Sequence, residues 1–72
     1  MASKLHIADS GSIVDSSSKD LLSFAKTTSA TNNIKITNAA NSGTPIIEAV
    51  GESDSNVSLV LKTKGSGALL LE

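Results

Sequence analysis

The chain has 72 residues, a mass of 7.3 kDa and a net charge of −1, with six basic residues against seven acidic ones. These charges are scattered, so the sequence lacks the basic stripe that nucleic acids and anionic membrane surfaces select. There is no cysteine, one histidine and one aromatic residue, Phe24, which excludes a disulfide framework and disfavours a structural zinc site. Because so short a chain buries only ~60% of its unfolded surface, we expect oligomerisation to supply the missing core.

The two ends of the sequence resemble residues left by the cloning sites of an expression vector: Met1-Ala2-Ser3 and Leu71-Glu72. We therefore expect residues 4–70 to be a single segment excised from a longer protein. No apolar run reaches the ~20 residues of a membrane span, so neither a spanning segment nor a signal peptide is expected.

The first half of the chain alternates apolar and polar residues with period 2, which predicts short strands that each bury one face. Strands are expected at residues 5–7, 13–14 and 22–24, with turns at residues 9–11 and 15–18. Residues 21–25 also fit a short helix, since Ser17 and Asp20 resemble a capping box. The run Thr27-Thr28-Ser29 leaves little room for such a helix, so a strand is favoured.

The second half continues the same pattern. Strands are expected at residues 34–36, 46–50, 57–61 and 68–70, and the strand at 57–61 is expected to be the longest. Turns rich in glycine, asparagine and serine separate them at residues 41–45, 51–56 and 65–67. The sequence therefore predicts an all-β chain of short strands and turns.

Strands this short cannot form a stable sheet within one thin chain. Wound around identical partners, they could point compact aliphatic side chains inward and present lysine, serine, threonine and asparagine to water, which discourages edge-to-edge aggregation. We expect a narrow fibrous oligomer, and its buried residues are predicted to be Leu22, Phe24, Ile34, Ile36, Ile47, Val57, Leu59 and Leu61.

The stretch from residue 15 to residue 70 resembles the shaft repeat of bacteriophage tail fibres and tail spikes, and of related giant-virus proteins. The similar pieces, in order, are Asp20-Leu21-Leu22-Ser23-Phe24, Thr28-Ser29-Ala30-Thr31-Asn32, Ile34-Lys35-Ile36-Thr37-Asn38-Ala39-Ala40, Gly43-Thr44-Pro45, residues 51–61 and residues 62–68. The last piece is similar to a Pro-Lys-Gly-Thr-Gly pattern that closes such units, with Thr63 in place of the proline and Ser66 in place of the threonine.

That resemblance implies an intertwined homotrimer, a triple-stranded β-helix or β-prism, which serves as a rigid shaft in the virion. It supplies the number of chains and the viral setting. The implied partners are two further copies of the chain and the neighbouring segments of the parent fibre. No cofactor and no nucleic acid are implied.

Candidate chemistry is sparse. His6 could bind a metal if three copies met on a trimer axis, but if Leu5 and Ile7 point inward, His6 points outward. A solvated histidine is the favoured interpretation.

Glu48, Glu52 and Asp54 lie close together in sequence, as the paired carboxylates of a glycosidase or the ligands of calcium would. The absence of tryptophan and tyrosine disfavours a saccharide site, and turn chemistry accounts more simply for Asp54 and Asn56. We expect no catalytic residues.

Three functions remain open. The favoured one is a structural shaft segment that spaces or supports a host-attachment or cell-puncturing tip. The alternative is a module on a trimeric fibre that binds host polysaccharide, with a cell-surface glycan as its partner. An enzyme has no supporting residues, and an ice-binding solenoid would need Thr-X-Thr ladders that the chain lacks.

Overall fold

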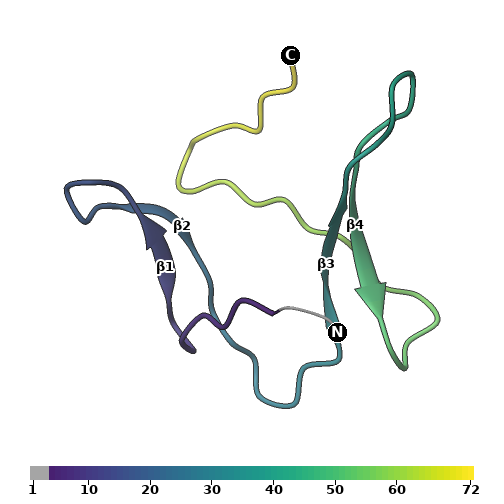
Figure 1. Ribbon diagram of the computed structural model, residues 1–72, viewed down its shortest axis with the longest axis horizontal. Helices are drawn as coiled ribbons and strands as arrows, with labels where there is room; N and C mark the ends of the chain where they lie inside the picture. The colour runs from purple at the N-terminus through teal and green to yellow at the C-terminus, as the bar shows by residue number, and fades with distance from the viewer. Residues whose placement is uncertain (1–3) are drawn as a thin grey trace. The chain divides into compact units, whose positions relative to one another are not determined.

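A computed structural model describes residues 4–72, so the expected vector-derived residues 1–3 lie outside the described part. The described chain contains four strands: β1 (Ser12–Val14), β2 (Asp20–Ser23), β3 (Asn32–Thr37) and β4 (Ile46–Gly51). They form two antiparallel hairpins, β1–β2 and β3–β4 (Figure 1). The predicted all-β class is confirmed, and within residues 4–72 no helix has the length and apolarity to cross a membrane.

The β1–β2 hairpin belongs to a unit that ends at Ala30. Ile13 lies opposite Leu22, and Val14 lies opposite Asp20, so Leu21 has no partner and forms a β-bulge. Beyond the strands the pairing continues, because the backbone N–H of Phe24 donates to the carbonyl of Gly11 at 2.8 Å. The strand predicted at residues 22–24, rather than the helix, is therefore confirmed with an earlier start.

Residues 15–19 connect β1 to β2. The backbone N–H of Asp15 donates to the carbonyl of Lys19 at 2.9 Å, so these two residues enclose a three-residue loop. The Asp15 carboxylate accepts hydrogen bonds from the backbone N–H groups of Ser17 at 2.8 Å and Lys19 at 2.9 Å. Ser18 adopts a positive φ of 63°, the left-handed position that follows a type I turn in such loops. The turn predicted at residues 15–18 is confirmed.

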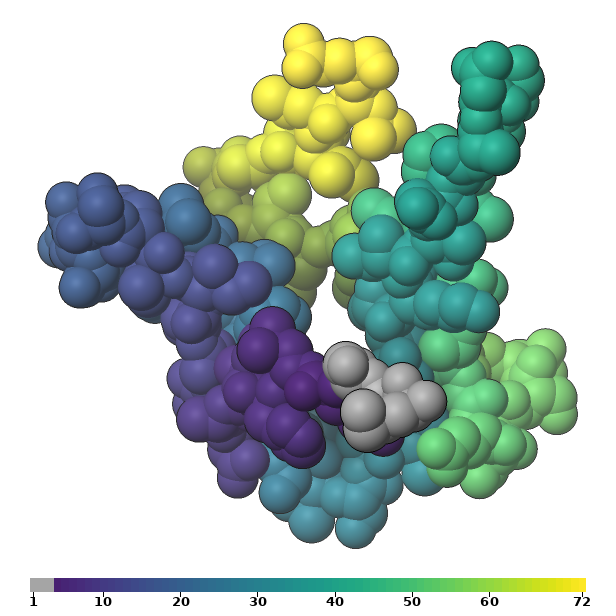
Figure 2. Space-filling model, viewed as in Figure 1, coloured from purple at the N-terminus to yellow at the C-terminus, as the bar shows by residue number. Residues whose placement is uncertain are grey.

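The β3–β4 hairpin belongs to the second unit, which begins at Thr31. Its register pairs Ile36 with Ile47, Ile34 with Ala49 and Lys35 with Glu48. The strands predicted at residues 34–36 and 46–50 are confirmed. The connecting segment turns at residues 40–43, where Ser42 has a φ of 73°, as the third residue of a type II turn requires. This tip stands out as a thin projection in teal (Figure 2).

None of residues 4–72 forms a buried hydrophobic core, and 17 large hydrophobic side chains are exposed. The accessible surface of the chain is 7078 Å². A compact monomer of this mass would expose ~4,200 Å², and two separate compact bodies of half the mass would together expose ~5,000 Å². The surface of the chain exceeds even that of two separate compact bodies, so the additional exposed surface lies within each unit. A single chain leaves most of its apolar surface in water.

The turns follow one another at a regular interval. From the β1–β2 loop onward, turns or bends begin at residues 16, 28, 41, 52 and 65. Consecutive turns thus begin about 12 residues apart, which marks a short repeat of extended segment and turn. The turns predicted at residues 9–11, 41–45, 51–56 and 65–67 all fall on turns or bends.

Three predicted strands are wrong for this chain. Residues 5–7, 57–61 and 68–70 belong to no strand. A strand requires a hydrogen-bonded neighbour, and the two hairpins hold only β1 with β2 and β3 with β4. The alternating pattern of these segments is real, but no other segment of the described chain pairs with them.

Candidate functional site: an apolar assembly surface

The β3–β4 hairpin has one face made largely of aliphatic side chains. Side chains alternate along a strand, so residues opposite each other in the register share a face. The pairs Ile36–Ile47 and Ile34–Ala49 therefore lie on the same side, which we call the apolar face. Ile36 is 77% exposed and Ile47 is 63% exposed. Cross-strand contact alone does not remove this surface from water.

Val57 covers one end of the apolar face. Gly51, the last residue of β4, lies opposite Asn32 and shares the side of Ala49 and Ile47. A β-carbon built on Gly51 would lie 3.2 Å from Cγ2 of Val57 and would also collide with Oδ1 of Asn32. The missing side chain of Gly51 thus lets the returning chain approach the hairpin. Val57 is partly shielded from solvent there, whereas most of its neighbours in sequence are exposed.

A hydrogen bond between distant residues fixes this return. Nδ2 of Asn32 donates to Oδ2 of Asp54 at 2.9 Å, which ties the loop after β4 to the start of β3. Nearby, the backbone N–H of Glu52 donates to the carbonyl of Thr31 at 3.2 Å. The turn interpretation of Asp54 is wrong in detail, because its carboxylate accepts from a strand side chain and not from the adjacent backbone.

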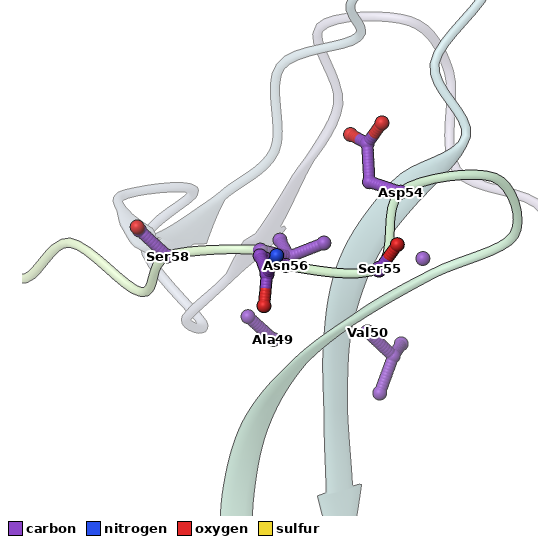
Figure 3. Close-up of a pocket in the computed structure, with 8 residues that line it drawn as sticks. Ala49, Val50, Asp54, Ser55, Asn56 and Ser58 are labelled. Atoms are coloured by element: carbon purple, nitrogen blue, oxygen red, sulfur yellow. The ribbon is translucent and has the colours of Figure 1, made fainter.

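An open hollow of about 530 Å³ lies where residues 54–58 pass the end of β4. Figure 3 shows Ala49 and Val50 pointing in opposite directions, with Asn56 above Ala49. The polar lining of the hollow comes from Asp54, Ser55, Asn56 and Ser58. Asp54 is the sole ionisable group of the lining, so the hollow lacks a carboxylate pair for glycoside hydrolysis.

The other face of the β3–β4 hairpin is more polar. Lys35 and Glu48 lie directly opposite each other there, beside Thr37. Opposite charges at such a cross-strand position stabilise the pairing modestly. This face also carries Val50, opposite Asn33, and Ile46, opposite Thr37, so it is mixed, whereas the apolar face is aliphatic at both central pairs.

The first unit repeats this arrangement. Ile13 and Leu22 are cross-strand partners, and Phe24 follows Leu22 by two positions on the same side. Opposite Phe24 lies Gly11, and a β-carbon built on it would collide with Cγ2 of Ile7. At one end of each hairpin, an aliphatic side chain from an unpaired segment thus lies over a glycine: Val57 over Gly51 and Ile7 over Gly11. An ion pair between Lys26 and Asp9, at 3.7 Å, also joins the two sides of this unit.

The predicted core residues fall into three groups. Four of them, Ile34, Ile36, Ile47 and Val57, come together on or over the apolar face. Leu22 and Phe24 share a face of the first unit, whereas Leu59 and Leu61 lie in the segment without a strand partner. The burial of all eight side chains between copies of the chain stays a prediction.

The remaining candidates are isolated. His6 is exposed and lies outside the strands. In the part of the chain that the structure describes, no three histidine, cysteine or acidic side chains gather as a metal site would require. Glu48 lies on the polar face of the β3–β4 hairpin, and Asp54 is engaged by Asn32.

The sequence interpretation did not count Ala49, Gly51 and Ile7 among the buried residues. A signal for Ala49 was present, because each interval between turns contains apolar residues spaced by two: Leu22 and Phe24, Ile34 and Ile36, Ile47 and Ala49, Leu59 and Leu61. The roles of Gly51 and Ile7 depend on contacts between segments that no local pattern encodes.

Comparison with known proteins gives no further lead: no protein-family model, no curated protein and no solved structure matches the chain.

Proposed function

We propose that this chain is a shaft segment of a viral tail fibre or tail spike, in which three copies assemble into a rigid rod. Each copy contributes its apolar face and its unpaired segments to a shared core, as a triple-stranded β-helix or a β-prism. The rod spaces or supports a tip that attaches to the host or punctures it. Neighbouring segments of the parent fibre continue the rod, and the assembly belongs to the virion.

The observation that carries this proposal is an apolar face that Val57 covers at one end only. Ile34, Ile36 and Ile47 are each at least half exposed, although their pattern is that of buried strand residues. Contiguous exposed apolar surface of this kind marks an association site in soluble proteins. The similarity of residues 15–70 to viral shaft repeats supports the number of chains and the biological setting.

The chemistry of the described residues favours a mechanical role. The carboxylates are dispersed, and the single aromatic residue, Phe24, offers little stacking surface for a sugar. A shaft needs neither a carboxylate pair nor aromatic stacking surface. It needs a repeated strand–turn unit, an aliphatic interior and a polar exterior, and the chain offers all three.

Sedimentation equilibrium and sedimentation velocity on the purified chain, together with a protease digest, test the proposal. We expect a species of three times 7.3 kDa that resists protease and has the high frictional ratio of a rod. A species of 7.3 kDa would contradict the proposal. A glycan array on the same sample separates the two roles: a shaft segment binds no saccharide, whereas specific retention of a host polysaccharide would favour the binding module.

A further inference from the structure

We propose that residues 57–62 of one copy add as a third strand to the free edge of β4 in another copy. This inference rests on the proposed assembly and specifies its main contact. It identifies the partner of the segment as a second copy of this chain, and it assigns the edge to which the segment binds.

The first observation is a run of unpaired backbone. Within residues 4–72, no backbone–backbone hydrogen bond involves a group of residues 56–63. Backbone N–H and C=O groups are obligatory hydrogen-bonding groups once a segment is buried. Val57, Leu59 and Leu61 share one side of the segment, and this alternation, which only Val60 interrupts, indicates burial of that side. A strand from outside the chain satisfies both requirements.

The second observation is that β4 has a free edge. β3 occupies one side of β4, and no strand of the described residues occupies the other. An exposed edge of this length is a template for strand addition. The connection after β4 already brings Val57 over the apolar face. Residues 57–62 therefore leave the hairpin with their aliphatic side chains directed to the same side as the exposed apolar face.

The third observation is charge complementarity. Residues 46–56 carry three acids, Glu48, Glu52 and Asp54, and no base, whereas residues 57–67 carry Lys62 and Lys64 and no acid. The β3 segment carries Lys35 and no acid, so the free edge of β4 attracts the lysines and that of β3 repels them.

The same alignment of residues 57–62 with β4 suits both the apolar and the charged side chains. If Val57, Leu59 and Leu61 align with the face of Ile47 and Ala49, alternation places Lys62 on the opposite face together with Glu48. One alignment thus buries the aliphatic side chains and brings opposite charges together. A shift by one residue would lose both contacts at once.

Proline substitutions test the strand addition. Neighbouring residues in a strand direct their N–H groups to opposite sides, so either Leu59 or Val60 must donate to the partner. Neither N–H has a backbone acceptor within the described chain. We expect Leu59→Pro or Val60→Pro to raise the dissociation constant of the trimer about a hundredfold or more over the matched Leu59→Ala or Val60→Ala control.

A charge exchange tests the choice of edge. We expect Lys62→Glu to weaken the trimer about tenfold, Lys19→Glu to leave it unchanged, and Glu48→Lys to restore part of the assembly in the Lys62→Glu background. Equal effects of Lys62→Glu and Lys19→Glu would overturn the assignment to β4.

The outcomes separate this inference from the proposed function. If the unsubstituted chain is a trimer and both proline variants match their alanine controls, the strand addition is refuted while the shaft assembly stands. If the unsubstituted chain sediments as a monomer, both are refuted.

Discussion

Cγ2 of Val57 lies 3.2 Å from the position that a β-carbon on Gly51 would occupy. This relationship shows how the second unit begins to cover its apolar face. Gly51 keeps a negative φ, so its role is to provide space and not to permit an unusual backbone conformation. The chain can therefore turn at residues 52–55 and return across the end of the hairpin.

Gly51→Ala should destabilise the assembled protein by about 1–3 kcal/mol, because the added methyl group overpacks a site already filled by Asn32 and Val57. The measurement is the denaturant midpoint at a fixed protein concentration, since the stability of an oligomer depends on concentration.

Asn32→Ala provides the control for this prediction. It removes the oxygen that a β-carbon on Gly51 would meet first, so Gly51→Ala should cost less in the Asn32→Ala background. A cost that is identical in both backgrounds would show that the two residues are not coupled.

The elements that sequence reasoning predicted well are those fixed by neighbours along the chain. Turn residues such as Asp15 and Ser42 act on their own backbone, and the period-2 pattern of Ile34 and Ile36 identifies β3 directly. Such turns and strands can be predicted from a few neighbouring residues in the sequence.

The elements that it missed depend on residues far apart in sequence. The Leu21 bulge is set by the register of β1 against β2, and Asn32 binds Asp54 across 22 positions. The pattern of residues 57–61 predicts a buried strand, but a pattern does not reveal whether the neighbouring strand lies in the same chain. That question produced the wrong strand assignments and motivates the proposed strand addition.

Ser18→Gly should stabilise the β1–β2 hairpin by about 0.5–1 kcal/mol. Ser18 has a φ of 63°, and glycine removes the clash of Cβ with the backbone in this conformation, although it also gains entropy in the unfolded chain. Ser17 has no positive φ, so Ser17→Gly should destabilise the hairpin instead. Thermal unfolding of both variants checks the prediction, and a lower melting temperature for Ser18→Gly would contradict it.

Asp15→Ala should lower the free energy of unfolding by about 1 kcal/mol, because it removes the acceptor of two backbone hydrogen bonds. Asp15→Asn keeps an oxygen in that position and should restore most of the loss. Amide hydrogen exchange at Ser17 and Lys19 provides a local measurement. Faster exchange in the alanine variant alone is expected, and unchanged exchange would show that the carboxylate does not hold the loop.

Leu59→Asp should abolish assembly, whereas Val60→Asp should preserve it. The two residues are adjacent, so they point to opposite sides of the segment. Leu59 belongs to the predicted core, and its replacement would bury three unpaired carboxylates, one from each copy, at a large cost in free energy. Val60 is 75% exposed, and alternation places it on the side of Ser58 and Lys62, where a carboxylate stays hydrated. Sedimentation should therefore give a mass of 7.3 kDa for Leu59→Asp and three times that mass for Val60→Asp. A trimeric Leu59→Asp protein would show that Leu59 faces water in the assembly.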